Sequence, residues 1–162
     1  MEVVAKEKIW KVLSTVTDPE VPVLTILDLG IVRAVNCERN VPEIVITPTY
    51  TGCPAMNTIE VNIKAAMQEA GYQLVDVKTI LSPAWTTDWL SEEGKRKLRE
   101  YGIAPPVGRV DKNALLLEET VVPCPLCHST DTEMLSQFGS TACKSLYRCK
   151  TCLEPFDYFK CH

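Results

Sequence analysis

Hydrophobic residues recur at every third or fourth position in two stretches of the first half of the chain, and this spacing predicts two amphipathic helices. The first helix spans residues 2–16 and ends before Pro19, because the residue preceding a proline is pushed out of helical geometry. The second helix spans about residues 54–70, and Gly71 follows as its C-cap. Each helix therefore presents one apolar face to a core.

Shorter apolar runs between and after the helices predict three strands, at residues 31–37, 43–47 and 75–81. A turn connects the first two strands, so we expect them to form a hairpin. The order helix, strand, strand, helix, strand favours an α+β fold, in which helices pack on one face of a small mixed sheet.

The length of the chain, 162 residues, suits one domain with a small appendage. We expect a first domain at residues 1–105, a linker at 106–120 and a zinc-ribbon-like module at 121–162. No apolar run approaches the ~18–20 residues that a membrane span requires, and the amino terminus lacks the pattern of a secretory signal. We therefore expect a cytoplasmic protein without a membrane partner.

Four of the eight cysteines form two Cys-x-x-Cys pairs, Cys124 with Cys127 and Cys149 with Cys152. In a reducing compartment such pairs indicate a metal site rather than disulfides. Four thiolates in a tetrahedron suit Zn²⁺, and so small a module buries too little apolar surface to fold without a metal. We predict one structural zinc ion, held by a ribbon with short strands at residues 132–138, 144–147 and 156–159.

The charge of this module argues against nucleic-acid binding. Its acidic side chains match its basic ones in number, and a zinc ion held by four thiolates adds a charge of about −2. The whole chain carries a net charge of −4. Since binding to a phosphate backbone needs the opposite sign, we expect no nucleic-acid partner.

The stretch Thr47–Asn57 marks the point where a predicted strand gives way to a helix. Cys53 lies there between Gly52, which permits a sharp turn, and Pro54, which is favoured at the first helical position. We therefore expect Cys53 to be the N-cap, where unpaired N–H groups and the helix dipole favour the thiolate. The alternative is a buried cysteine that fills a corner between strand and helix.

Three further side chains are candidates for chemistry. Asp18 and Asp28 are conspicuous acids of the first domain, and with Cys53 they suit soft or mixed metal coordination; they could equally cap turns. Cys143 lies in a loop of small residues before Lys144, which predicts an exposed and partly ionised thiol. Ordinary packing within the loop is the alternative for Cys143.

Residues 82–102 contain Trp85 and Trp89, followed by a basic helix. Large aromatic side chains beside positive charges have the composition of an interface core and its rim. We predict a docking surface for a client protein or for a second copy of the chain, so a homodimer is a further expectation. The alternatives are a core position for the tryptophans and a solvated face for the basic helix.

Several motifs resemble the signature of the metal–sulfur cluster assembly family that includes bacterial SufT, over about residues 5–81. They are Asp18-Pro19-Glu20, Asp28-Leu29-Gly30 and Thr49-Tyr50-Thr51-Gly52-Cys53-Pro54. The chain is similar over nearly its whole length to the PaaD (PaaJ) family of phenylacetate-degradation proteins, through residues 82–89, 138–144 and 154–157. Ala142 departs from this similarity, since we expect a proline there.

The resemblance implies an auxiliary protein of the phenylacetyl-CoA epoxidase, a multicomponent diiron oxygenase whose reductase carries a flavin and a [2Fe–2S] cluster. It implies a maturation factor, not an enzyme, that works with the iron–sulfur assembly machinery. Iron or a cluster would bind transiently at Cys53, with Asp18 and Asp28 as neighbours. Two alternatives stay open: an accessory subunit of the oxygenase complex that contributes no chemistry, and a redox or hydrolytic enzyme that uses Cys53.

Overall fold

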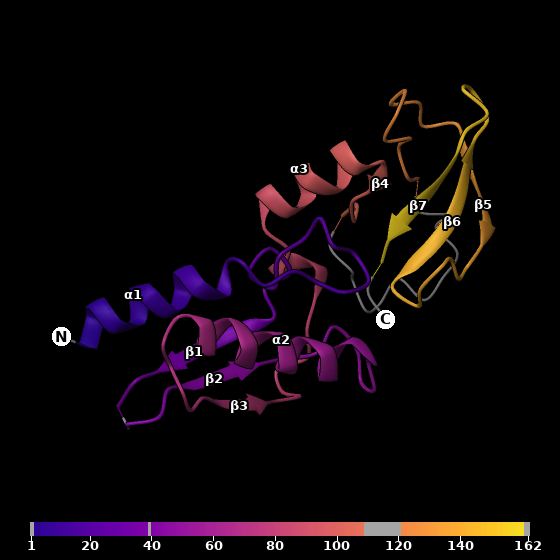
Figure 1. The fold of residues 1–162 in the computed structure, drawn as a ribbon. Helices are drawn as coiled ribbons and strands as arrows, with labels where there is room; N and C mark the ends of the chain where they lie inside the picture. The colour runs from indigo at the N-terminus through magenta and orange to yellow at the C-terminus, as the bar shows by residue number, and fades with distance from the viewer. Residues whose placement is uncertain (1, 39, 109–120, 161–162) are drawn as a thin grey trace. The chain divides into compact units, whose positions relative to one another are not determined.

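The structure is a computed structural model that describes residues 2–38, 40–108 and 121–160. The chain divides into two compact units, and each unit has its own sheet (Figure 1). Unit 1 comprises Met1–Trp85 and Trp89–Ser91, and unit 2 comprises Thr86–Asp88 and Glu92–His162. Within the described ranges, no helix has the length and apolar character needed to cross a membrane.

Unit 1 is built on a three-stranded sheet with β2 in the centre. Strand β1 (Val32–Asn36) pairs antiparallel with β2 (Glu43–Ile46), and β2 pairs parallel with β3 (Asp76–Thr79). Helix α2 (Ala55–Glu69) connects the two parallel strands, so β2, α2 and β3 form a crossover unit. The predicted hairpin and the predicted mixed sheet are both confirmed.

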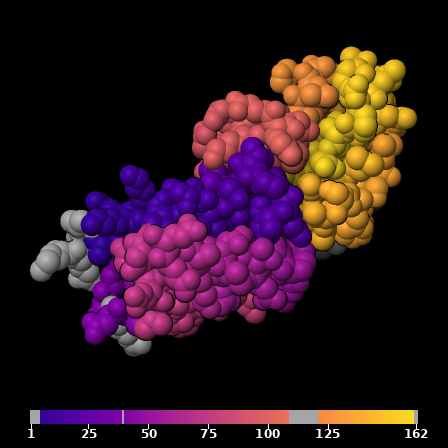
Figure 2. All heavy atoms as spheres, in the orientation of Figure 1, coloured from indigo at the N-terminus to yellow at the C-terminus, as the bar shows by residue number. Residues whose placement is uncertain are grey.

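Aliphatic side chains fill unit 1 because its two helices turn apolar faces inward. Helix α1 (Glu2–Leu13) packs against α2 and β1, and Figure 2 shows the two helices side by side on the surface. Helix α2 buries a residue about every turn, at Ala55, Ile59, Ile63 and Met67. The large side chains of unit 1 that are fully buried are Ile9, Leu13, Leu24, Ile26, Leu29, Ile31, Ile44, Ile46, Ile59, Ile63 and Met67.

The two tryptophans pack against the turn that precedes β1. Trp85 is only 5% exposed, and its indole N–H donates a hydrogen bond to the carbonyl of Leu29 at 2.6 Å. The guanidinium carbon of Arg33 lies 3.5 Å from the ring centroid of Trp89. A Cβ on Gly30, whose φ is +67°, would lie 2.5 Å from the carbonyl oxygen of Trp89, so no larger residue fits. The predicted docking role is therefore wrong for Trp85, which belongs to the core.

Unit 2 contains a four-stranded sheet in the order β4-β7-β6-β5. Strands β5 (Thr132–Ser136), β6 (Lys144–Cys149) and β7 (Pro155–Phe159) pair antiparallel, and their positions agree with the predicted ribbon strands. Strand β4 (Ile103–Ala104) pairs parallel with β7 and follows α3 (Glu92–Tyr101). The small buried cluster of this sheet consists of Ala104, Val122, Cys124, Tyr147, Cys149 and Phe156.

The predicted domain boundary at residue 105 differs from the boundary between the two units. Strand β4 lies before residue 105, yet it pairs with β7, and Ala104 belongs to the buried cluster of the ribbon. Ile103 and Ala104 are both buried in this position, and their burial explains why they belong to unit 2. Residues 109–120, which form most of the predicted linker, lie outside the described residues.

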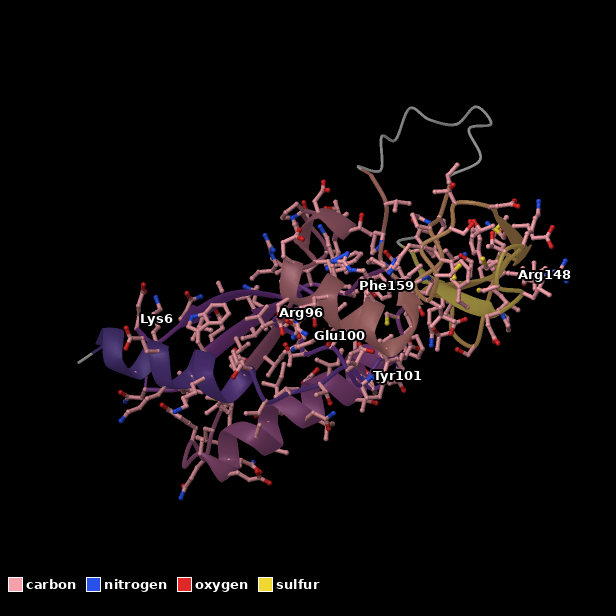
Figure 3. The ribbon with its side chains drawn as sticks, turned by 90° about the horizontal axis from the view of Figure 1, so that it is seen from above. Lys6, Arg96, Glu100, Tyr101, Arg148 and Phe159 are labelled. Carbon is pink, nitrogen blue, oxygen red and sulfur yellow. The ribbon has the colours of Figure 1, made fainter. Side chains whose placement is uncertain are left out.

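Two basic side chains of α3 form ion pairs with acids of the same helix. Arg96 contacts Glu100 at 2.5 Å (Figure 3) and Glu93 at the same distance, and Lys95 contacts Glu92 at 2.7 Å. Hydrogen bonds from Arg96 to the two glutamates raise the pKa of its guanidinium. Pairs at these spacings are typical of an exposed helix, so α3 fits the solvated-face alternative better than a basic docking patch.

Candidate functional site

The four paired cysteines lie on two similar turns at one end of the ribbon sheet. The first turn, residues 124–128, precedes β5, and the second, residues 149–153, connects β6 to β7. His128 and Leu153 occupy the corresponding position after each pair, with φ of 62° and 66°. Non-glycine residues seldom adopt such angles. Here they turn the chain back after each pair, so that the carbonyls of Ser129 and Glu154 accept from the N–H groups of Cys124 and Cys149.

The sulfur positions fit a single tetrahedral metal ion. All four Sγ atoms lie within 4.8 Å of one another. The distance is 3.8 Å between the sulfurs of Cys124 and Cys152, and 3.5 Å between those of Cys127 and Cys149. Four sulfurs at the usual zinc–sulfur distance of about 2.3 Å would lie about 3.8 Å apart. The predicted ligand set is therefore brought together as a metal centre.

The pKa values of the thiols show why this group needs a cation. Backbone N–H groups, chiefly that of Cys152, lower the pKa of the Cys149 thiol to about 6. The N–H of Glu154 favours the Cys152 thiolate, yet burial and the neighbouring sulfurs raise the pKa of Cys152 to about 12. One thiolate of this turn thus disfavours the other, and a coordinating metal ion would stabilise both.

Cys53 lies half-buried in the loop that joins β2 to α2. Its N–H donates to the carbonyl of Tyr50 at 3.2 Å, and its own carbonyl accepts from the N–H of Met56 at 3.3 Å. The prediction that Cys53 is the N-cap is wrong by one residue. The structure assigns the N-cap to Pro54, whose own backbone angles are already helical, with φ −67° and ψ −22°, and no side chain caps the helix.

The position of this loop is favourable for binding even so. Gly52 has a φ of +79°, which confirms the predicted sharp turn before the cysteine. In sheets with parallel crossovers, ligands bind at the carboxyl ends of the strands. Cys53 follows the carboxyl end of the central strand, in the loop that begins such a crossover.

Thr47, at the end of β2, was missed by the sequence analysis. It is 1% exposed, and its hydroxyl has no hydrogen-bond partner among the described residues. A buried hydroxyl without a partner costs about 1–3 kcal/mol. A group bound at this end of the strand could supply the partner, but a threonine in a strand gives no sign of this in the sequence.

Asp18 and Asp28 are both buried and hold turns through hydrogen bonds. The Asp18 carboxylate accepts from the N–H groups of Glu20 at 2.8 Å and Val21 at 2.7 Å. The Asp28 carboxylate accepts from the N–H and hydroxyl of Thr25, at 3.0 and 2.9 Å, and from the hydroxyl of Ser91 at 3.2 Å. Both aspartates therefore cap turns, which is the alternative that the sequence left open for them.

Cys53, Asp18 and Asp28 do not converge on one ion in this structure. Across the described ranges, the four ribbon cysteines form the one group of three or more His, Cys, Asp or Glu ligand atoms within 4.8 Å. A transient site that uses all three residues therefore stays a prediction, and it would require movement of the turns around the two carboxylates.

Cys143 is buried, with 6% of its surface exposed, so the expected exposure of this thiol is wrong. The hydroxyl of Thr141 lies 3.1 Å from its sulfur, and the following Lys144 is also buried, 3.8 Å from Asp157. The sequence predicted an open loop because its residues are small, but β6 begins at once and draws both side chains inward. Whether the thiol reacts stays a prediction; Cys161 and His162 lie outside the described residues.

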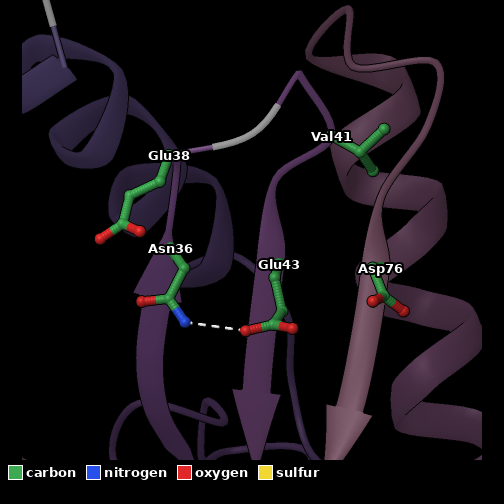
Figure 4. A pocket seen from close by; sticks show the side chains of 5 residues that line it. All are labelled: Asn36, Glu38, Val41, Glu43 and Asp76. Carbon is green, nitrogen blue, oxygen red and sulfur yellow. Dashed lines mark hydrogen bonds between the residues drawn. The ribbon is translucent and has the colours of Figure 1, made fainter.

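An acidic hollow lies at one end of the sheet of unit 1 (Figure 4). Its volume is about 300 Å³, and it is lined by Asn36, Glu38, Val41, Glu43 and Asp76. The amide of Asn36 donates to Glu43 at 2.8 Å. Among the described residues, its three carboxylates do not belong to any group of three or more ligand atoms within 4.8 Å of one another.

The chain combines a first domain that matches a family of iron–sulfur cluster assembly proteins with a ribbon that carries four clustered cysteines. The family described as iron-sulfur cluster assembly protein matches residues 6–78. The family described as PaaD zinc beta ribbon domain matches residues 109–160. The first match includes Cys53, and the second includes all four ribbon cysteines.

A relative from Escherichia coli K12, which is named as a subunit of a 1,2-phenylacetyl-CoA epoxidase, is 52% identical over 95% of this chain and 92% of its own length. The chain belongs to the PaaD family. The Fe-S protein maturation auxiliary factor YitW of Bacillus subtilis is 33% identical, over 59% of this chain and 94% of its own length. The similarity to this maturation auxiliary factor thus extends over little more than half of the chain.

A solved structure supports the fold. The domain of unknown function DUF59 from Bacillus anthracis superimposes with a TM-score of 0.55 and 27% sequence identity. The match covers 60% of this chain and 93% of that one. The predicted α+β class is therefore confirmed.

Proposed function

We propose that this chain is a maturation factor that helps to supply the [2Fe–2S] cluster of the reductase in the phenylacetyl-CoA epoxidase system. Two kinds of relative support the proposal: iron–sulfur maturation factors that resemble the first part of the chain, and a protein named as an epoxidase subunit that resembles nearly all of it. The coarser conclusion, a role in iron–sulfur maturation or in the epoxidase system, is common to both.

One observation carries the proposal, the position of Cys53 in the β2–α2 loop of an assembly domain. The thiolate is the form of cysteine that ligates iron. A single protein sulfur holds iron or a cluster weakly enough to release it, which suits a carrier better than a resident cofactor site. The unpaired hydroxyl of Thr47 lies at the end of the same strand and could donate to a bound group.

Asp18 and Asp28 would support this transfer site, or join it transiently after release from their turns. Their present hydrogen bonds hold the segment before β1, so their first contribution is to shape the turns around Gly30 and Glu20. No general base is placed beside Cys53 by the sequence, and for that reason we propose delivery of a cargo rather than catalytic turnover.

The ribbon would hold Zn²⁺ in a structural role. Zinc imposes no geometry of its own and accepts four thiolates at the spacing described above. Bound metal would fix the two turns that carry Cys124, Cys127, Cys149 and Cys152. The ribbon would then fold as a stable module and serve as a docking element for the reductase or for the assembly machinery, in the cytoplasm.

A second candidate function is that of an accessory component of the oxygenase complex. The similarity to a protein named as an epoxidase subunit extends over both units, which favours this alternative. An accessory component would remain in the complex at fixed stoichiometry, whereas a maturation factor acts before the complex works and need not remain.

The test produces the reductase once together with this chain and once together with its Cys53→Ser variant, and compares the cluster content of the two reductase samples. We expect the variant to keep its fold and metal content but to yield a reductase poor in iron and labile sulfide. Cys37→Ser is the matched control, because Cys37 is also a half-buried cysteine of unit 1. A normal cluster content with Cys53→Ser would remove this thiol from the mechanism.

Reconstitution separates the two candidate functions. If the chain delivers the cluster, chemical reconstitution of the reductase restores phenylacetyl-CoA epoxidation even when the Cys53→Ser variant was used. If epoxidation stays absent after reconstitution and returns only when the unmodified chain is added, the chain is an accessory component of the complex.

A further inference from the structure

The four cysteine residues of the ribbon site differ in their exposure to solvent. Cys124 and Cys149 are fully buried, with 0% of their surface exposed, and Cys152 is half-buried. Cys127 is exposed, as are its neighbours Leu126, at 56%, and His128. The metal centre therefore has a closed side and one corner that solvent reaches.

The two turns also hold their sulfurs differently. In the second turn, the N–H of Cys152 donates to the sulfur of Cys149 at 3.5 Å. In the first turn, the N–H of His128 donates to the carbonyl of Cys124 at 3.0 Å, and the N–H of Cys124 donates to the carbonyl of Ser129 at 2.9 Å. The backbone of the first turn thus stabilises its own shape, whereas that of the second also stabilises a thiolate.

We propose that Cys127 is the ligand at which the metal centre opens, and that its sulfur is the modification site of the ribbon for soft electrophiles such as α,β-unsaturated carbonyl compounds. This inference rests on the metal site assigned under the proposed function. Exposure decides which sulfur a reagent reaches, and the lack of cover over Cys127 gives it priority over its three partners.

The chemical step is an addition. The sulfur of Cys127 uses one lone pair to form a bond to the β-carbon of the electrophile, and the π bond between the α- and β-carbons breaks as its electrons form an enolate. The α-carbon of the enolate then takes a proton from water, which leaves as hydroxide. No electrons are gained or lost overall. The alkylated sulfur is a neutral thioether and a much weaker ligand, so the metal keeps three thiolates and dissociates.

The experiment uses the full metal-loaded chain carrying serine at its four cysteines outside the metal site, Cys37, Cys53, Cys143 and Cys161, so that the four ribbon cysteines are the remaining thiols. A limiting amount of N-ethylmaleimide is added, labelled cysteines are mapped by peptide mass spectrometry, and released metal is followed with a colour-forming chelator. We expect the first label on Cys127, and we expect metal release at the rate of that labelling.

Two histidine variants keep the inference falsifiable, since zinc also accepts three cysteines and one histidine. Cys127→His should bind metal but release it several-fold more slowly under N-ethylmaleimide, whereas Cys152→His should release it at the original rate. A first label on Cys124, Cys149 or Cys152, or equal release rates in the two variants, would overturn the inference alone. A parent chain without bound metal would overturn the metal site as well.

Discussion

The two units of this chain are stabilised by different means. Of the twelve largest fully buried side chains among the described residues, eleven lie in unit 1, and the twelfth, Leu98, lies in α3 of unit 2. The ribbon sheet instead has a small cluster in which two of the six buried members, Cys124 and Cys149, belong to the four-cysteine group that can hold a metal ion. Unit 1 therefore depends on burial of hydrocarbon, whereas we expect the ribbon to depend on coordination.

The two units should therefore be destabilised by different changes. Burial of apolar area contributes about 25 cal/mol per Å² and is spread over many side chains, so no single contact decides it. Coordination is concentrated in four bonds and depends on metal supply and on pH. The following predictions test whether the two kinds of stability are separate, in order of decreasing effect.

Loss of one ligand should remove the metal and unfold the ribbon while unit 1 stays folded. Cys124→Ser leaves three sulfurs, which bind far more weakly than four, so we expect almost complete loss of metal from the purified chain. Hydrogen exchange should then accelerate at β5, β6 and β7 and stay slow in α2. Cys143→Ser is the control, since Cys143 is buried in the same unit and is not a ligand. Loss of protection in α2 as well would show that the units are not separate.

Acid should have the same selective effect. The pKa of Cys149 lies below the ordinary thiol value, so its thiolate stabilises the folded ribbon above about pH 8.5, and this contribution is lost as pH falls through about 6. Protons also compete with metal for all four sulfurs. Metal content measured after dialysis should therefore be full at pH 8 and fall steeply below about pH 6. Full retention at pH 5 would contradict this.

A cavity in unit 1 should destabilise that unit and leave the metal in place. Ile63→Ala removes a side chain of α2 that is 0% exposed, and we expect a loss of about 2–5 kcal/mol in the free energy of unfolding of unit 1. Denaturant unfolding followed in α2, with metal analysis of the folded protein, provides the measurement. Val61→Ala, on the same helix but 63% exposed, should change the free energy by less than about 0.5 kcal/mol.

Removal of one buried hydrogen bond should have a smaller effect on unit 1. Trp85→Phe deletes the N–H that donates to the carbonyl of Leu29, and leaving that carbonyl without its partner should cost about 1–3 kcal/mol. The same denaturant titration measures it. An unchanged midpoint would contradict the core position of Trp85 and favour the docking surface predicted from the sequence, because an exposed tryptophan could lose its N–H at no cost.

Sequence patterns were sufficient to predict those features whose determining residues lie close together along the chain. The apolar spacing of Ile59, Ile63 and Met67 identified α2, and the Cys-x-x-Cys spacing identified the four cysteines that the structure brings together. The strand–loop–helix around Cys53 was also predicted, with the N-cap displaced by one residue. In each case the residues that decide the structure lie within a few positions of one another.

Features that depend on distant residues were not predictable in this way. Trp85 is buried because the carbonyl of Leu29 and the surface around Gly30 accept it, and nothing near residue 85 reveals those partners. The pairing of β4 with β7 joins segments about fifty residues apart along the chain, for which periodicity carries no information. The burial of Cys143 follows from the start of β6, which the small residues of the loop concealed.

The two-residue strand β4 has a consequence for the ribbon as a transferable module. An exposed strand edge offers unpaired N–H and carbonyl groups to any other chain, and proteins cover such edges to avoid aggregation. Ile103 and Ala104 cover one edge of β7, although they precede the segment that matches the ribbon family. A ribbon excised from residue 121 onward would expose the edge of β7 that β4 covers. A fragment intended to stay monomeric should therefore begin before residue 103.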